Sequence, residues 1–257
     1  MNAFNSVRFE LQLPWMLREI MAKRPVAYIP LGTYEWHCEH LPVGLDALTA
    51  HGVCLRAALI DGGVVLPAMH YGCGGGHGAY PWTVIPSDPD HIEALLCFTL
   101  QRLEANGMRL AVLFSGHFAP TQLDMIDRIA KDWNGEVRSL RVFATSVNRV
   151  EGLPLSPDHA GIFETTLLAA LWPELMQLDR LPSLTDAPLA EGDVWEEGRH
   201  DPKHPIWGVV GPDPRHFKAE QAKPLLDASV AWLVNQVRQH LSSWQFESRP
   251  KPSAALI

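Results

Sequence analysis

Two histidines and two carboxylates crowd the segment GTYEWHCEH, residues 32–40, which follows the apolar run VAYIPL. These residues are Glu35, His37, Glu39 and His40. Charged side chains at the end of a buried strand cost free energy unless something compensates them. A bound cation is the simplest compensation, so the segment predicts a metal site.

The spacing of the candidate ligands fits such a site. Glu35 and His37 are two residues apart, so on a strand they point the same way with Cα atoms about 6.6–6.8 Å apart. Asp46 follows the sequence HLPVG, whose proline and glycine allow the chain to fold back, and a carboxylate there could bridge two ions about 3.5–4 Å apart. His117 ends the apolar segment RLAVLFSGH. Mixed imidazole and carboxylate ligands suit Zn²⁺, Mn²⁺ or Fe²⁺ better than Ca²⁺ or Mg²⁺.

A glycine-rich loop at 72–80, GCGGGHGAY, contains the spacing G-x-G-x-x-A of a dinucleotide fingerprint. That fingerprint requires a helix directly afterwards, and YPWTVIPSDP at 80–89 cannot form one. A flexible loop that brings His77 near a substrate is the better interpretation. We also assign Trp82 and His40 to substrate binding. The alternatives are a loop histidine without a role and two packing residues.

The elements that must hold these side chains alternate between buried strands and amphipathic helices, which is typical of an α/β fold. Strands are predicted at 25–32, 63–72 and 109–117 and within 136–148. Helices are predicted at 47–63, 88–107, 120–135, 161–175 and 225–243. The fourth helix must stop near Pro173. Ligands of open α/β sheets bind outside the carboxyl ends of the strands, where Glu35 and His117 are expected.

The composition limits the class of protein. Its 257 residues fit one α/β domain, 1–257. The net charge of −8, without a dense stripe of lysine and arginine, argues against nucleic-acid binding. No apolar run reaches the roughly 18 residues of a membrane span. The four cysteines form no CxxC pair and the N-terminus shows no signal peptide, so we expect a cytoplasmic protein.

Two segments fall outside the alternation of strands and helices. Residues 178–215 are irregular and rich in proline, aspartate, glycine and tryptophan. A segment of this length is more often functional or in contact with another subunit than a simple connector. Residues 246–257 predict a loose tail or an oligomer contact.

Five segments carry the most specific motifs of the chain. In order, they are PLGTYEWHCEHLPVGLDALTA, YGCGGGHGAYPWT, LFSGHFAP, DHAGIFETT and WGVVGPDPRHFKAEQAKPLL. Together they resemble the creatininase family of metal-dependent amide hydrolases over roughly residues 25–235. The resemblance implies a three-layer α/β/α sandwich with a mostly parallel central sheet, assembled as a homo-oligomer, often a hexamer. It also implies two divalent metal ions per chain and a small-molecule substrate.

The resemblance also implies roles for individual residues. Glu35, His37, Asp46 and His117 match metal ligands, with Asp46 in the bridging position. His159 matches the histidine that donates and accepts a proton beside the metals. A metal-activated water then opens a C–N bond of a cyclic or small amide.

One departure from the family pattern affects the ligand set directly. Ala119 stands where creatininases carry a glutamate ligand, so a second ion lacks a ligand unless Glu164 supplies it. Glu164 follows His159 by five residues, about 1.4 helical turns, so both can face the site. We therefore count Glu164 as a candidate metal ligand and catalytic residue. The alternative is a carboxylate behind the ligands or on the helix surface.

Further departures concern the pocket. Ser115, Pro120 and Ile162 replace residues that many relatives carry, which disfavours creatinine itself as the substrate. The main hypothesis is a metal-dependent amidohydrolase. One alternative is ring opening of a cyclic ketone or lactone, or an isomerisation, on the same scaffold. Another is a non-catalytic family member with a degenerate site, for which Ala119 and Pro120 are the best arguments.

Overall fold

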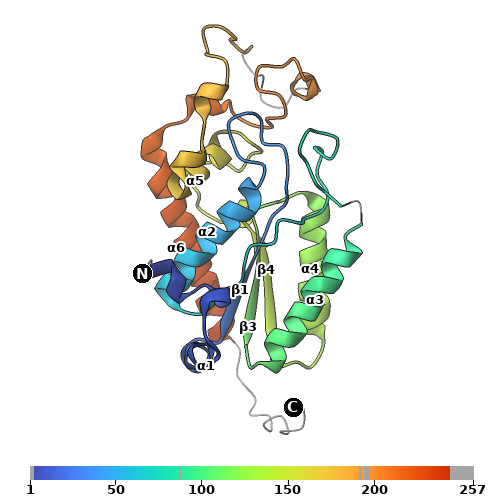
Figure 1. The fold of residues 1–257 in the computed structure, drawn as a ribbon, viewed down its shortest axis with the longest axis vertical. Helices are drawn as coiled ribbons and strands as arrows, with labels where there is room; N and C mark the ends of the chain where they lie inside the picture. The colour runs from blue at the N-terminus through green and yellow to red at the C-terminus, as the bar shows by residue number, and fades with distance from the viewer. Residues whose placement is uncertain (1–2, 87, 191–192, 194–196, 244–257) are drawn as a thin grey trace.

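A parallel β-sheet of four strands lies at the centre of the fold (Figure 1). The computed structural model of the protein describes residues 3–86, 88–190, 193 and 197–243. The strands are β1 (Val26–Leu31), β2 (Val64–Val65), β3 (Leu110–Ser115) and β4 (Arg141–Ser146), in the order β2-β1-β3-β4. All neighbouring strands are parallel, so their carboxyl ends lie along one edge of the sheet.

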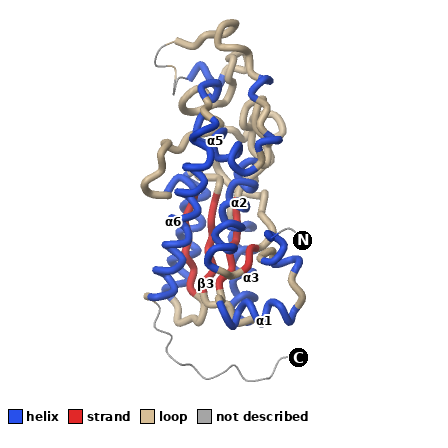
Figure 2. Tube along the Cα trace, turned by 90° about the vertical axis from the view of Figure 1, so that its left-hand side faces the viewer, coloured by secondary structure: helices blue, strands red, loops and turns tan. Residues whose placement is uncertain are grey.

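Helices cover both faces of this sheet. They are α1 (Pro14–Lys23), α2 (Leu45–Asp61), α3 (Asp90–Ala105), α4 (Pro120–Gly135), α5 (Ile162–Leu171) and α6 (Ala222–Ser242). Helices α2, α5 and α6 lie on one face, and α3 and α4 lie on the other (Figure 1). Figure 2 views the molecule with α2, α5 and α6 in front of the strands. The predicted three-layer α/β/α sandwich with a parallel central sheet is confirmed.

Two apolar cores result from the alternation of side chains along the strands. In β1, Val26 and Tyr28 pack into the core with α2, α5 and α6, whereas Ala27 and Ile29 pack into the core with α3 and α4. Every residue of β1 and β3 is buried. A strand covered on both faces is apolar at every position, which explains the continuous runs in the sequence.

The predicted elements agree with the structure except at a few places. The strand predicted at 63–72 is regular only at Val64–Val65, because Pro67 has no N–H to continue the ladder; the pairing resumes as a single bridge between Met69 and Leu31. The helix predicted at 161–175 already ends at Leu171, two residues before Pro173. Helix α1 was not predicted.

The segment 178–215 lies at the end of the molecule to which the strands point (Figure 1). Its described residues form the 3₁₀ helices η5 (Leu178–Arg180), η6 (Glu197–His200) and η7 (Pro214–His216), joined by loops. The predicted tail at 246–257 lies outside the described residues. Among the described residues, no helix combines the length and apolar character needed to cross a bilayer.

Two glycines allow the first turn of α2 to touch the ends of β1 and β3. A Cβ atom on Gly32 would lie 2.1 Å from the backbone nitrogen of Ala47, and one on Gly116 would lie 2.0 Å from the carbonyl oxygen of Asp46. Neither position tolerates a side chain without a backbone shift. The close approach places Asp46 directly above the strand ends.

We expect Gly116→Ala to lower the free energy of unfolding by about 1–3 kcal/mol, because the added methyl group pushes α2 away from β3. Urea denaturation measures this change. Gly135→Ala is the matched control, since no atom lies within 4 Å of its Cβ position and it ends α4. Equal stabilities of the two variants would contradict the close-packing argument.

Candidate metal centre

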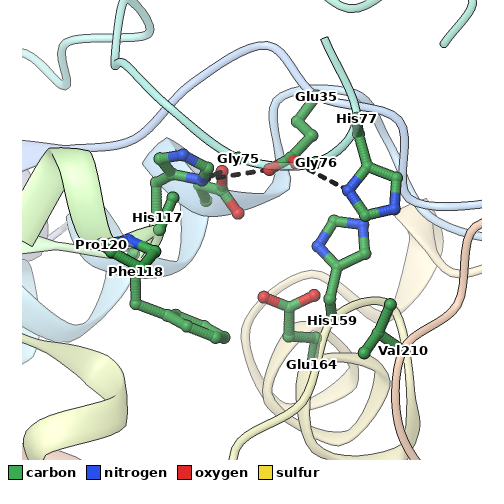
Figure 3. Close-up of a pocket in the computed structure, with 13 residues that line it drawn as sticks. Glu35, Gly75, Gly76, His77, His117, Phe118, Pro120, His159, Glu164 and Val210 are labelled. Atoms are coloured by element: carbon green, nitrogen blue, oxygen red, sulfur yellow. Dashed lines mark hydrogen bonds and ion pairs between the residues drawn. The ribbon is translucent and has the colours of Figure 1, made fainter. Parts of the chain in front are cut away.

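The candidate ligands converge at the carboxyl end of the sheet although they come from four parts of the chain. Glu35 and His37 follow β1, Asp46 lies in the first turn of α2, and His117 follows β3. Glu164 lies in the first turn of α5. Figure 3 shows Glu35, His117 and Glu164 around one cavity.

These residues form two groups of possible metal ligands that share Asp46. Glu35, Asp46 and His117 form one group, and His37, Asp46 and Glu164 form the other, with the ligand atoms of each group within 4.8 Å of one another. Asp46 Oδ1 lies 3.1 Å from His37 Nε2, and Asp46 Oδ2 lies 3.2 Å from His117 Nδ1. The two oxygens of one carboxylate therefore face different histidines, as a bridging ligand requires.

Burial leaves atoms of this cluster without a hydrogen-bond partner. Glu35, Asp46 and Glu164 are only 2, 1 and 3% exposed. Glu35 Oε2, His37 Nε2 and Asp46 Oδ2 have no hydrogen-bond partner. Unsatisfied buried polar atoms are costly, and divalent cations held by the two groups would satisfy all three. The donor set of carboxylate oxygens and imidazole nitrogens fits a divalent transition metal.

Backbone carbonyl groups orient the two ligand histidines. His37 Nδ1 lies 2.9 Å from the carbonyl oxygen of Glu35, and His117 Nε2 lies 3.1 Å from that of Gly74. A carbonyl oxygen only accepts, so these nitrogens carry the protons. The other nitrogens, His37 Nε2 and His117 Nδ1, are left with lone pairs that face the carboxylates, which is the arrangement of metal-bound histidines.

His77 and His159 stack on each other at the side of the cluster, with ring centroids 4.1 Å apart. His159 Nε2 lies 2.9 Å from the carbonyl oxygen of Trp36, so Nδ1 is the nitrogen left for chemistry. His77 Nδ1 lies 3.1 Å from Glu35 Oε1, and its Nε2 lies 2.9 Å from the carbonyl oxygen of Gly208. Desolvation lowers the pKa of His159 to about 3, so its imidazole is neutral.

The electrostatic surroundings of the carboxyl groups differ. Burial alone would raise the pKa of Glu35, but neighbouring histidines, among them His77, whose Nδ1 lies 3.1 Å from Oε1, hold it well below its usual value. Burial raises the pKa of Glu164 well above its usual value, and Asp46 adds to this rise. Glu164 is therefore the carboxyl group of the cluster that most lacks positive charge in its surroundings.

Backbone strain marks the same region. Cys38 and Ala160, which directly follow His37 and His159, have φ angles of 58° and 55°. Residues other than glycine rarely adopt such values, and they tend to do so at functional sites. At Ala160 this conformation accompanies a hydrogen bond of 2.6 Å from its N–H to Glu164 Oε2.

Asp158 stabilises the start of α5. Its carboxylate accepts hydrogen bonds from the backbone N–H groups of Gly161, Phe163 and Glu164, at 3.1, 2.9 and 3.3 Å. The carbonyl of Trp36 orients the His159 ring, whereas Asp158, the residue before His159, binds these backbone groups at the start of α5. An aspartate shortly before a helix is a known capping pattern, so this role could have been predicted.

The segment 208–211 holds both stacked histidines. His159 and Val210 form an antiparallel bridge, with N–H to carbonyl bonds of 2.8 and 2.9 Å, and the Gly208 carbonyl accepts from His77. Arg199, which is 1% exposed, donates to the carbonyl oxygen of Gly211 at 2.6 Å. Its guanidinium also pairs with Asp193 at 3.0 Å.

A cavity of about 200 Å³ adjoins the cluster. Its lining residues are Glu35, Asp46, Gly75, Gly76, His77, Gly116, His117, Phe118, Ala119, Pro120, His159, Glu164 and Val210. The sequence prediction missed Gly75, Phe118 and Val210. Phe118 directly follows His117, which could have indicated it, whereas Val210 reaches the cavity only through its pairing with His159.

Two predicted substrate contacts are not among these lining residues. His40 is 1% exposed and its Nε2 lies 3.0 Å from Thr165 Oγ1, so it packs behind the ligands. Trp82 is 78% exposed and is not among the residues that line the cavity. His77 and Glu164, by contrast, lie at the cavity.

A three-layer α/β/α fold with buried acids and imidazoles at the carboxyl ends of its strands is typical of metal-dependent hydrolases. The chain belongs to the creatininase family, because the sequence model of that family, described as creatinine amidohydrolase, matches residues 13–237. The predicted family is thus confirmed, and with it the enzyme class of metal-dependent amidohydrolases.

Several relatives agree with this assignment. Creatinine amidohydrolase of Pseudomonas putida is 25% identical over 252 residues, 89% of this chain and 95% of that protein. A mycofactocin precursor peptide peptidase of Mycolicibacterium smegmatis is 29% identical over 189 residues, 68% of this chain and 69% of that protein. A crystal structure of creatininase matches with a TM-score of 0.69 at 24% identity, over 89% of this chain and 96% of that one.

Two further creatininase structures are described by their metals. One is a manganese form, at 24% identity and a TM-score of 0.69, and the other is a Zn–Zn form of a variant, at 23% and 0.67. In both cases the match spans 89% of this chain and 96% of the creatininase chain.

We expect Glu164→Gln to lower the metal content by about half, because only one of the two ligand groups that share Asp46 contains Glu164. Asp46→Asn should affect both groups and lower the metal content further. Elemental analysis of the purified variants measures this. Glu39→Gln is the control, since Glu39 is an exposed carboxylate of the same loop. Full metal content in Asp46→Asn would contradict the bridging role.

Proposed function

We propose that the enzyme hydrolyses a C–N bond of a cyclic or other small amide with two divalent ions per chain. The observation that carries this proposal is the sharing of Asp46 by two ligand groups, with the neutral His159 beside them. The ions are Zn²⁺, Mn²⁺ or Fe²⁺, as the ligand types favour and as the metals described for related creatininases support. When bound, they supply the Lewis acidity that polarises a carbonyl group and acidifies water.

His159 is the residue that moves the proton in this proposal. The Trp36 carbonyl fixes its Nε2–H, so Nδ1 takes a proton from the attacking water and passes it to the departing nitrogen. Desolvation lowers the pKa of His159, so its imidazole is neutral and Nδ1 has a free lone pair for that proton; the ring then readily gives the proton up to the departing nitrogen. The stack with His77 and the bridge to Val210 hold the ring in place.

Glu164 supplies the metal-ligating carboxylate that Ala119, in place of a glutamate, does not provide. Its Oε2 lies 3.5 Å from His37 Nε2 and within one ligand group with Asp46. The N–H of Ala160 holds this oxygen in place at 2.6 Å. This replacement argues against a degenerate, non-catalytic site.

Ring opening of a lactone or a cyclic ketone is the alternative within the same enzyme class. It differs in the leaving atom, which would not be nitrogen. Assembly as a homo-oligomer, a hexamer by family resemblance, and a cytoplasmic location are also part of the proposal. Turnover of matched lactams and lactones by the metal-loaded enzyme distinguishes the two reactions.

We expect His159→Gln to lower kcat by about 10²–10⁴-fold, because it removes the group that transfers the proton. His159 forms a further possible ligand group with Glu35 and His37, but we assign its Nδ1 to proton transfer, so the metal content should remain that of the wild type. Steady-state kinetics and elemental analysis of the same preparation measure both quantities.

His70→Gln provides the control for this variant. His70 stacks on Tyr34 with centroids 4.9 Å apart and does not line the cavity. Unchanged turnover in His159→Gln would refute the proton-transfer role, and loss of metal would show a ligand role instead.

A further inference from the structure

Two chemically different kinds of side chain line the cavity beside the ligand cluster. The polar ones are the carboxylates and imidazoles described above. The apolar ones are Phe118, Ala119, Pro120 and Val210, which have no polar side-chain atom. In Figure 3, Phe118 and Pro120 lie with His117, and Val210 lies across from them beside His159. Among the described residues that line the cavity, there is no lysine, arginine, serine, threonine, asparagine or glutamine.

The apolar character of this wall follows from the position of the glutamate. The residue two after His117 is Ala119, and the carboxylate of the cluster comes from Glu164 on α5 instead. The wall that continues from β3 has therefore no charge. Phe118 is partly buried against the core formed with α2, α5 and α6, which fixes its position. A charged substrate group placed against this wall would lose water without gaining a partner, which is costly.

Gly76 leaves space at the mouth of this cavity. Gly75 beside it needs to be glycine, because its φ is +107° and a Cβ would lie 3.2 Å from Glu35 Oε1. Gly76 has no such φ, and no atom lies within 4 Å of its Cβ position. Neither backbone conformation nor a neighbouring atom requires glycine there. The space at Gly76 is thus available to a bound molecule.

We propose that the part of the substrate next to the scissile bond is uncharged and apolar, seated between Phe118–Pro120 and Val210 and extending past Gly76. This proposal rests on the proposed function and names its substrate class: small amides with an aliphatic or aromatic substituent. The cavity of about 200 Å³ lies below the 300–1,000 Å³ typical of drug-sized sites, so the substituent is small.

Binding of hydroxamic acids to the metal-loaded enzyme tests the apolar wall without turnover. Hydroxamates chelate the metals, and their substituent can be methyl, isobutyl, benzyl, aminopropyl or carboxyethyl. Titration calorimetry should give at least about tenfold tighter binding for isobutyl or benzyl than for aminopropyl or carboxyethyl. Equal or tighter binding of the charged compounds would overturn the proposal, as would the absence of binding by all of them to metal-loaded protein.

A pair of glycine variants tests the path past Gly76. Gly76→Val should weaken binding of the benzyl compound at least about tenfold and leave the methyl compound unchanged, because only the larger group reaches residue 76. Gly78→Val is the matched control: its Cβ position is equally free of neighbours, but Gly78 does not line the cavity. Metal content should be unchanged in both variants.

If the two variants act alike, the path past Gly76 is wrong. Failure of the enzyme to hydrolyse any amide, with the expected order of hydroxamate affinities, would overturn the proposed reaction and support the apolar site. Amide turnover without the expected order of hydroxamate affinities would support the proposed reaction and overturn the apolar site.

Discussion

The buried carboxylate of Asp46 is the group on which the rest of the site depends. Its two oxygens lie 3.1 and 3.2 Å from histidines that follow different strands. A carboxylate removed from water keeps its charge only if positive or polarised groups surround it. The backbone provides the precision of this placement, because Gly32 and Gly116 let the first turn of α2 contact both strand ends.

The layers of the fold contribute different parts of the site. The loops after β1 and β3 present Glu35, His37 and His117, whereas the helical layer that contains α5 presents His159 and Glu164. The carboxylates of the cluster come from the loop after β1, from α2 and from α5, and the residues that follow His117 after β3 are apolar. In the proposed function, the segment after β3 therefore supplies both one metal ligand and part of the substrate wall, whereas the proton carrier comes from the segment before α5.

The sequence predicted the parts of the fold that depend on local patterns. The apolar runs of β1 and β3 are buried throughout, so the residues that follow them could be placed at the carboxyl edge of the sheet. The short length of β2 could not be predicted, since it depends on how the chain after Pro67 lies against β1. Resemblance to a family placed His159 and Glu164, which local patterns alone would not have joined to Glu35.

Contacts between distant segments were beyond sequence reasoning. Val210 reaches the cavity because its backbone pairs with that of His159, which lies far away in the sequence. His40 carries the same chemical groups as the ligand histidines, yet its ring is directed to Thr165. Trp82 lies on the surface and itself has a φ angle of 60°. Side-chain type alone does not determine direction.

Arg199 holds the segment 208–211 in place, and this segment supports the stacked histidines but not the rest of the ligand cluster. The acids and imidazoles around Asp46 are positioned by the sheet and by α2 and α5. The stacked histidines also depend on the segment 208–211, because His77 hydrogen-bonds to Gly208 and His159 pairs with Val210. A local opening of the segment 208–211 would therefore displace His159, the proton carrier, while the ligand cluster around Asp46 stayed assembled. Loss of the proton carrier through such an opening would thus be a different event from disassembly of the ligand cluster.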